Sequence, residues 1–422
     1  MDFLSDQVDQ YADLLISTGV NLQPGQPLQI SAELEHAPFV RKIAAKAYDA
    51  GASYVQVVWM DALLQRARLK HSRADYLDIY PDFEIQKYRQ FVDERWARLS
   101  LTGPEDPHAM DDVDAGAMRR AAKSRREGIR FYMDAIMSNR FQWCVAAVPT
   151  QAWAAQIYPD LAPDDAVARL WSVILDVCRV KTADPQAAWR THDKALSRVV
   201  DFLHARQIRT LLYEDPTPGP DGKPCTKLSI GMTGQPVWIA ASSTTTHGIV
   251  FFANMPTEEI FTTPHRLKAD GWARTTKPFF PFERRVEDAY FRFEEGKVVE
   301  FTAAVGQDVL TSFFEMDGAR HLGEVALVDQ RSPVNQAGVI FYETLFDENA
   351  ACHIAFGDAY LEGYAGGDDL DPAEYAGVGI NKADVHLDVM LGSPTLNITG
   401  VTADGEQVPI MRDGQFVEAA LS

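Results

Sequence analysis

Residues 384–391 have the sequence Asp-Val-His-Leu-Asp-Val-Met-Leu, in which apolar residues alternate strictly with the others. Alternation with a period of two predicts a β-strand that has one face in a hydrophobic core. His386 and Asp388 then point to the same side, with Cα atoms roughly 6–7 Å apart. At that spacing an imidazole nitrogen and a carboxylate can bind one metal ion. Taken alone, the pattern favours a strand with a solvated polar face, and only the rest of the C-terminal half changes that interpretation.

The length and composition indicate an acidic globular protein. A chain of 422 residues is long for one domain, so two domains are the natural expectation. The hydrophobic fraction of 46 % and the charged fraction of 24 % are ordinary for a chain that buries a sizeable core. The net charge of -20 argues against binding to nucleic acid or to an anionic membrane surface. It also leaves spare carboxylates that could hold divalent cations.

The cysteines indicate a reducing compartment. Cys144, Cys178, Cys225 and Cys352 are far apart and form no Cys-x-x-Cys pair, so neither a zinc ribbon nor a disulfide framework is indicated. Cys352 is expected to be buried and inert. Residues 1–7 lack the basic and apolar regions of a secretory signal, and no apolar run approaches the length of a membrane span. We therefore expect a cytoplasmic enzyme with reduced thiols.

The N-terminal half alternates between strand and helix patterns. Residues 28–32 and 54–60 are expected as strands, and a helix over 39–50 between them ends at Gly51, a common C-terminal residue. Strand, helix and strand at this spacing predict a βαβ unit with parallel strands. The pattern continues with strands expected at 97–102 and 141–148, and with helices expected at 115–137, 164–180 and 185–206. The sequence therefore predicts an α/β N-terminal domain with a mainly parallel sheet.

The rhythm changes after residues 214–225, which contain several Pro, Gly and Asp residues and are expected as a loop or domain junction. Short strand patterns separated by turns follow. We expect an N-terminal domain over residues 1–225 and a β-rich α+β domain over residues 226–422 that carries the metal site. Residues 363–379 are rich in Gly and Asp and are expected as a surface loop.

Two adjacent carboxylates, Glu258 and Glu259, follow an apolar strand pattern at residues 249–252. Carboxylates at the end of a strand are well placed for a site. The alternative is local, because Thr257 could cap a short helix whose dipole the glutamates would stabilise. For this motif alone, the local alternative is favoured.

Further candidate ligands lie in apolar surroundings. Glu324 begins an apolar strand within residues 321–328, where a carboxylate is either solvated at the sheet edge or neutralised by a cation. Glu348 and His353 belong to a similar stretch, residues 345–357. A lone histidine in such a place is more often a hydrogen-bonded core residue than a metal ligand.

Taken together, these segments resemble one known family, the thermophilic-type metallo-aminopeptidases (aminopeptidases T, S and II). The similarity lies in four segments in matching order and spacing: residues 254–259, 322–328, 344–349 followed by His353, and 386–388. Residues 19–25, Gly-Val-Asn-Leu-Gln-Pro-Gly, also resemble the opening of the family. The resemblance covers nearly the whole chain, and its departures lie mainly in the N-terminal half and in residues 363–379.

The resemblance implies a metal site. The implied metal ligands are Glu258, Glu324, Glu348, His353, His386 and Asp388. Glu324 would be shared by two ions, and Tyr360 would match a tyrosine at the active site of the family. An oxygen-rich set with two imidazoles and no thiolate suits two divalent ions of zinc, cobalt or manganese without selecting among them. The family further implies a homodimer with an enclosed active-site cavity and a preference for short peptides.

The implied reaction removes N-terminal residues from short peptides, using a water activated by two divalent ions. The free α-amine of the peptide would bind near one ion or a carboxylate. Tyr360 is the expected hydrogen-bond donor to the developing oxyanion. Glu259 is the candidate general base, although on a regular strand its side chain and that of Glu258 would diverge.

Two alternatives of other classes stay open. One is a non-catalytic protein that binds metal ions or peptides, and the other is a binuclear hydrolase of esters or phosphoesters. The motifs contain no obvious Arg or Lys clamp for phosphate, which weighs against phosphoesters. There is also no His-Glu-x-x-His, Gly-x-Ser-x-Gly or P-loop motif, so a serine hydrolase or nucleotide enzyme has no support.

Overall fold

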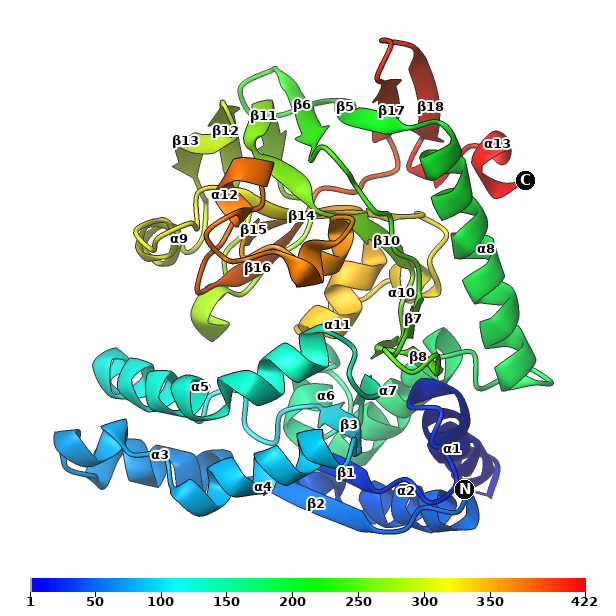
Figure 1. The fold of residues 1–422 in the computed structure, drawn as a ribbon, viewed down its shortest axis with the longest axis vertical. Helices are drawn as coiled ribbons and strands as arrows, with labels where there is room; N and C mark the ends of the chain where they lie inside the picture. Colours follow the sequence, from blue (N-terminus) through cyan, green and yellow to red (C-terminus); the bar gives the residue numbers. More distant parts are fainter. Residues whose placement is uncertain (1) are drawn as a thin grey trace. The chain divides into compact units, whose positions relative to one another are not determined.

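The computed structural model describes residues 2–422 (Figure 1). Contacts within the chain divide it into two compact units. The N-terminal unit contains the chain up to Trp189 together with Ser242–Met255, and the C-terminal unit contains Arg190–Ala241 together with Pro256–Ser422. The domain boundary expected between residues 225 and 226 stays a prediction.

A parallel five-stranded sheet forms the centre of the N-terminal unit. The strand order is β2-β1-β3-β4-β9, and all four neighbouring pairs are parallel. The strands are β1 (Leu28–Glu33), β2 (Val55–Met60), β3 (Ala97–Thr102), β4 (Trp143–Ala147) and β9 (Asn254–Met255). β7 (Ser242–Thr244) and β8 (Val250–Phe252) form a separate hairpin. The expected α/β fold with a mainly parallel sheet is confirmed.

Helices precede, connect and follow the first four strands of this sheet. They are α1 (Asp2–Leu14), α2 (Ala37–Asp49), α3 (Ala62–His71), α4 (Asp82–Asp93), α5 (Ala115–Met137), α6 (Gln151–Ile157), α7 (Pro163–Val177) and α8 (Pro185–Ala205), which contains the division between the units. Helices α2 to α5 make the crossovers between these parallel strands. The side chain of Asp114 accepts a hydrogen bond from the Ala117 N–H at 2.8 Å and so caps α5. Gly51 follows α2 with φ +93°, a backbone conformation that glycine adopts without strain.

Antiparallel sheets make up most of the C-terminal unit. The larger sheet has the strand order β13-β12-β11-β6-β5-β17-β18-β19. Its strands are β5 (Ile208–Pro218), β6 (Pro224–Met232), β11 (Pro264–Arg274), β12 (Tyr290–Glu294), β13 (Lys297–Thr302), β17 (Asn397–Thr402), β18 (Gln407–Arg412) and β19 (Gln415–Phe416). The smaller sheet has the order β10-β14-β15-β16, with β10 (Glu259–Thr262), β14 (Leu322–Val328), β15 (His353–Gly357) and β16 (His386–Met390). The expected β-rich C-terminal half is confirmed.

The C-terminal unit also contains short helices. They are α9 (Gln307–Phe314), α10 (Pro333–Gln336), α11 (Thr344–Asp347), α12 (Tyr375–Val378) and α13 (Glu418–Leu421). α12 lies within residues 363–379, so this stretch is not entirely a loop.

The expectation of a loop or domain junction at residues 214–225 is wrong. β5 and β6 extend into this stretch and pair as far as Pro218 and Pro224. A tight turn closes the hairpin, in which the Gly219 N–H donates to the Lys223 carbonyl oxygen at 2.7 Å. The Pro, Gly and Asp residues therefore mark a hairpin turn between two long strands of one sheet.

The four-stranded sheet is anchored through one of its faces by an aromatic cluster. The ring of Phe356 on β15 lies 4.9 Å from that of Phe291, 6.0 Å from that of Phe293 and 5.1 Å from that of Phe314, measured between centroids. Successive side chains of a strand point to opposite faces. The residues on either side of Phe356 therefore face away from this cluster, toward the other face of the sheet.

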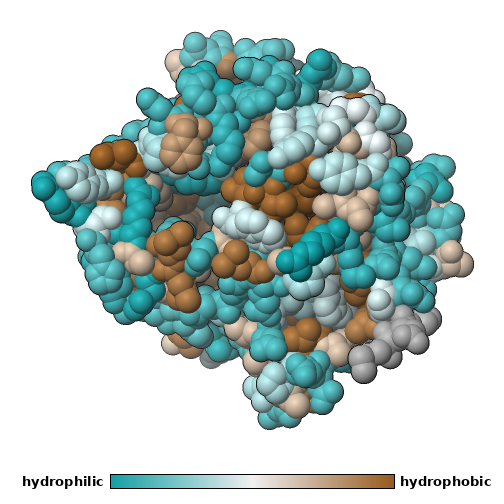
Figure 2. Space-filling model, turned by 90° about the horizontal axis from the view of Figure 1, so that it is seen from below, coloured by the Kyte–Doolittle hydropathy of each residue, from teal (hydrophilic) through white to brown (hydrophobic). Residues whose placement is uncertain are grey.

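The face of the molecule drawn in Figure 2 is largely hydrophilic, with apolar residues in separate patches. In the N-terminal unit, single large apolar side chains are exposed, such as Leu64 and Phe83, each 69 % exposed. None of the helices that the structure describes combines the length and the apolar character needed to cross a membrane.

Gly357 tests how tightly β15 and β16 are held together. Its φ is +102°, and a Cβ atom there would lie 2.0 Å from the Val385 carbonyl oxygen. We expect Gly357→Ala to lower the free energy of unfolding by at least about 1–3 kcal/mol, because backbone strain adds to a clash with fixed main chain. Thermal and denaturant unfolding measure the change.

Gly377→Ala is the matched control. Gly377 lies in α12, and a Cβ atom added there would meet no atom of another segment within 4 Å, so the same substitution should change stability little. Equal unfolding transitions for both variants would contradict the prediction.

Candidate metal centre

Five titratable side chains share one face of the four-stranded sheet, opposite the aromatic cluster. They are Glu259 on β10, Glu324 on β14, His353 on β15, and His386 and Asp388 on β16. Directly paired residues of antiparallel strands point to the same face. The register pairs Ala355 with both Glu324 and Asp388, Gly357 with His386, and Ala326 with His353. Small residues thus occupy the positions between the titratable side chains and leave space at the centre of the face.

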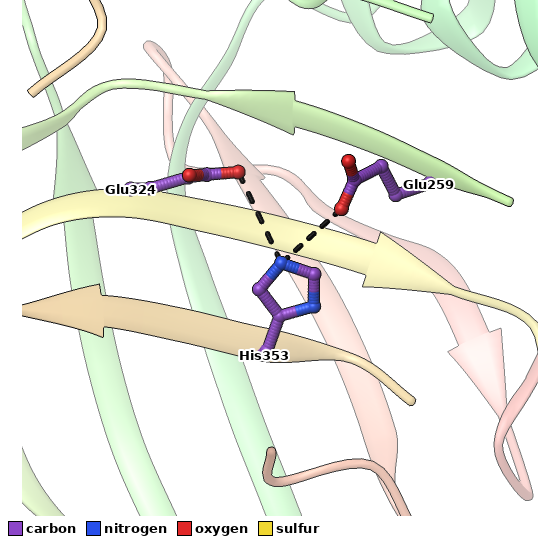
Figure 3. A group of neighbouring side chains, drawn as sticks. All are labelled: Glu259, Glu324 and His353. Carbon is purple, nitrogen blue, oxygen red and sulfur yellow. Dashed lines mark ion pairs between the residues drawn. The ribbon is translucent and has the colours of Figure 1, made fainter. Parts of the chain in front are cut away.

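Glu259, Glu324 and His353 form the first group of possible ligands (Figure 3). The His353 Nε2 atom lies 3.2 Å from the Glu259 Oε2 atom and 4.0 Å from the Glu324 Oε1 atom. Figure 3 shows the two carboxylates approaching the imidazole from neighbouring strands. All three residues are buried.

Glu324, His386 and Asp388 form the second group. The His386 Nε2 atom lies 3.3 Å from the Glu324 Oε2 atom and 3.3 Å from the Asp388 Oδ1 atom. In each group the candidate ligand atoms lie within 4.8 Å of one another. Glu324 contributes one oxygen to each group, which is the arrangement that a carboxylate shared by two ions requires.

A β-bulge at Gly323 aims Glu324 into the site. Leu322 pairs with Phe356 on the aromatic face, whereas Glu324 pairs with Ala355 on the opposite face. The extra residue between them reverses the orientation that simple alternation would give Glu324. A Cβ atom at Gly323 would lie 2.2 Å from the Asp358 carbonyl oxygen, so the bulge needs glycine.

Main-chain carbonyl groups orient both imidazoles. The Nδ1 atom of His353 lies 3.1 Å from the Ala351 oxygen, and that of His386 lies 2.8 Å from the Asp358 oxygen. An Nδ1–H that donates to these oxygens leaves Nε2 as the ring atom facing the carboxylates, which is a usual arrangement of metal-binding histidines. Asp358 and Ala351 carry no sequence signal for this role, because they act through their backbone.

The electrostatics of the site favour cations. Burial raises the pKa of Glu324, and burial together with the charge of Asp388 raises the pKa of Glu348 well above its usual range. Within residues 2–422, the ion pairs of Glu259, Glu324 and Asp388 are with histidines and not with lysine or arginine. Two imidazoles, even when protonated, cannot balance the four carboxylates of Glu259, Glu324, Glu348 and Asp388. Buried carboxylates left without a cation are costly. A buried, oxygen-rich set of ligands with two imidazoles fits divalent ions.

The imidazoles respond to the same carboxylates. Burial alone would lower the pKa of His353, but the hydrogen bond and charge of Glu259, with the further charges of Asp388 and Glu324, raise it to about 10. Burial would also lower the pKa of His386. The charges of Asp388 and Glu324 outweigh this effect and raise that pKa well above its usual value. The carboxylates therefore favour the protonated form of both imidazoles when no ion is bound.

Glu348 and Tyr360 lie beside the two groups but belong to neither. Glu348 lines the same cavity as His386 and Asp388. The Tyr360 ring lies 4.9 Å from the His386 ring and 5.6 Å from the Phe261 ring. Burial and the charge of Glu324 raise the pKa of Tyr360 well above 10, so its hydroxyl stays protonated and can donate.

Glu258, expected as a ligand, lies outside both groups found among the described residues. It directly precedes β10, and its Oε2 atom lies 3.6 Å from the Nε2 atom of His192 on α8. That nitrogen also lies 2.8 Å from the Thr257 carbonyl oxygen. Glu259, expected as the general base, instead stands among the ligand candidates. Nothing in the sequence around His192 indicated that it would lie beside Glu258.

Comparison with known proteins identifies the family. The model of the thermophilic metalloprotease (M29) family matches residues 4–416. The chain belongs to the M29 family. Its sequence is 39 % identical over 411 residues to aminopeptidase 2 of Geobacillus stearothermophilus, covering 97 % of each chain. It is 36 % identical over 418 residues to aminopeptidase T of Thermus aquaticus, covering 99 % of this chain and 100 % of that one.

The fold agrees with this assignment. The wild-type AmpT structure from Thermus thermophilus superposes with a TM-score of 0.89 at 35 % sequence identity, covering 98 % of this chain and 99 % of that one. The predicted resemblance to the thermophilic-type metallo-aminopeptidases is confirmed. The chain is a metallo-aminopeptidase of family M29.

The protonated imidazoles predict how ion binding depends on pH. A divalent ion needs a neutral imidazole, so binding must displace the proton that the raised pKa holds on His353. We expect the affinity for Zn²⁺ to rise from about pH 6 to about pH 9 and binding to release protons. Calorimetry in two buffers of different ionisation enthalpy measures the release.

His108→Gln provides the control, because this side chain is 76 % exposed and far from the metal centre in sequence. The variant should release as many protons on binding as the wild type. Binding that is independent of pH and releases no proton would contradict the prediction.

Proposed function

We propose that this chain removes N-terminal residues from short peptides with the help of two divalent ions of zinc, cobalt or manganese. The observation that carries the proposal is the pair of carboxylate and histidine groups that share Glu324 on one buried sheet face. The proposed ligands are Glu259, Glu324, His353, His386 and Asp388, with Glu259 in the place first expected for Glu258. When bound, such ions supply a Lewis acid for the peptide carbonyl and lower the pKa of water.

The side chains around the ligands have proposed roles of their own. Tyr360 would donate a hydrogen bond to the oxygen that gains charge as the carbonyl is attacked, because its raised pKa keeps the donor in place. Glu348, expected as a ligand, is our proposed proton acceptor. Its carboxylate lines the cavity, and a nearby positive charge would bring its raised pKa toward the range in which it accepts protons near neutral pH.

Glu258 has a proposed structural role. Its backbone N–H donates to the Asn349 Oδ1 atom at 2.7 Å, which links the start of β10 to the short helical turn that contains Glu348. With His192 near its carboxylate, Glu258 would hold this junction in position without binding an ion.

The chain's assembly and location are proposed from the resemblance and the thiols. A homodimer with an enclosed active-site cavity follows from the family resemblance and would restrict substrates to short peptides. The four cysteines are all free, three of them buried, which suits the reducing environment of the cytoplasm.

Chelation tests the activity. Protein stripped of ions should lose hydrolysis of leucine p-nitroanilide, and adding Zn²⁺, Co²⁺ or Mn²⁺ should restore it, because the water and carbonyl are then activated again. Undiminished cleavage by the stripped protein would contradict the proposal. Ion binding without cleavage of any aminoacyl substrate would favour a binding protein, and cleavage of esters or phosphoesters alone would favour another hydrolase.

Three glutamine substitutions separate ligand, base and structural roles. We expect Glu259→Gln to lose at least one of two ions, because it removes an anionic ligand, whereas Glu258→Gln should keep both. Glu348→Gln should also keep both ions but lower kcat about 10²–10⁴-fold. Elemental analysis after dialysis measures the ions, and assays at saturating metal measure kcat. Loss of ions from Glu258→Gln but not from Glu259→Gln would reverse the assignment.

A further inference from the structure

We propose that residues 278–282, together with Phe313, form the pocket for the side chain of the substrate's N-terminal residue and select bulky apolar side chains. The inference rests on the proposed aminopeptidase function and adds a substrate preference to it. It starts from a cavity of about 340 Å³ within the C-terminal unit. This volume lies at the lower end of the roughly 300–1,000 Å³ of ligand pockets, enough for one aminoacyl group.

Two kinds of residue line the cavity. The polar ones, here called the polar wall, are Thr344, Asp347, Glu348, Asp384, His386 and Asp388. The apolar ones are Val385, Leu387 and Met390 of the strand region and a group here called the aromatic wall, which is Pro278, Phe279, Phe280, Pro281, Phe282 and Phe313. A group that enters the cavity would therefore direct its polar end to the metal centre and its apolar part to the aromatic rings. The transfer of apolar surface out of water lowers the free energy of binding.

Contacts between aromatic rings hold the aromatic wall in position. The ring of Phe280 packs against that of Tyr342 at 5.7 Å between centroids, and the ring of Phe282 packs against that of Phe313 at 6.2 Å. Phe313 is buried and lies on α9, so it fixes the position of the wall.

Phe282 is held in an unusual conformation. Its φ is +54° and its ψ is +35°, a left-handed conformation that is unfavourable for a bulky residue. The residue is nevertheless 52 % exposed, so its contact with Phe313 leaves much of its surface available to a ligand. Strained residues cluster at active sites and ligand contacts, and Phe282 is one that lines this cavity.

An anionic side chain would find unfavourable partners here, because Glu348, Asp384 and Asp388 also line the cavity. Asp347 also lines the cavity, but it is 3 % exposed, and its carboxylate accepts hydrogen bonds from the Phe341 N–H at 2.9 Å and the Glu343 N–H at 3.3 Å. The carboxylate is thus committed to the main chain of the loop before α11. The other polar residues of the lining are Thr344, Asp384, Glu348 and the proposed ligands His386 and Asp388. Their carboxylates suit an α-amine.

The position of the pocket favours the N-terminal residue of the substrate over the next one. In an aminopeptidase the α-amine and the scissile carbonyl flank a single Cα atom, and both must reach the metal centre. The side chain on that Cα atom therefore begins next to His386 and Asp388 and extends into the adjoining cavity. The side chain of the second residue starts beyond the scissile bond and lies farther from this wall.

Substituting Phe282 tests the proposal. We expect Phe282→Ala to lower the ratio of kcat/KM for phenylalanine p-nitroanilide over alanine p-nitroanilide about tenfold or more, because apolar contacts to the larger side chain are lost. Phe282→Leu should give a smaller decrease, since it keeps an apolar side chain. The inhibition constant of the product phenylalanine should rise in Phe282→Ala, which reports binding without turnover.

Leu267→Ala is the matched control, because Leu267 is a 51 % exposed apolar residue on β11 outside the cavity lining. It should leave the ratio unchanged. An unchanged ratio in Phe282→Ala, a wild-type preference for arginine p-nitroanilide, or an effect that follows the second residue in Phe-Ala and Ala-Phe would overturn the pocket. Failure of the wild type to cleave any p-nitroanilide would instead overturn the proposed function.

Discussion

The arrangement of this site depends on one constraint: carboxylates gathered on a buried sheet face must be neutralised. Glu259, Glu324 and Asp388 form ion pairs with two imidazoles, and bulk solvent reaches little of their surface. Burying such charges without compensation costs several kcal/mol each. Divalent cations between the carboxylates remove that cost, so the same feature that would destabilise a metal-free site favours ion binding.

Several local features follow from this constraint. Ala326, Ala355 and Gly357 keep the centre of the face open, because any larger side chain in their register would occupy it. The bulge at Gly323 turns Glu324 toward the other ligands. The aromatic cluster around Phe356 supports the opposite face, so that four strands hold the ligand atoms in one geometry. Rigid strands suit a centre that must keep ligands within a fraction of an ångström.

Much of the fold could be predicted from local patterns. The helix at 115–137 and the strand at 97–102 agree with α5 and β3, because both have clear periodicity and clear ends. The prediction of a loop or domain junction at residues 214–225 was wrong, because Pro and Gly are as common in hairpin turns as in domain junctions. Strand pairing between β5 and β6 depends on the whole sheet, which local composition does not encode.

The site was predictable as a set of motifs but not in every detail. Alternation placed His386 and Asp388 on one side of a strand, as observed in β16. The choice between Glu258 and Glu259 depends on where β10 begins and which face it presents, and a strand of four residues gives too little periodicity to decide. The orientation of Glu324 depends on a bulge, and the orienting contacts of the histidines come from backbone carbonyls, which leave no trace in the sequence.

The most direct measurement of the central claim is anomalous diffraction from crystals of the protein loaded with Zn²⁺ or Mn²⁺. The account predicts two peaks roughly 3.5–4 Å apart, one on each side of the Glu324 carboxylate. One peak should lie next to Glu259 and His353, and the other next to His386 and Asp388. A single peak, or peaks that lie away from Glu324, would contradict the account.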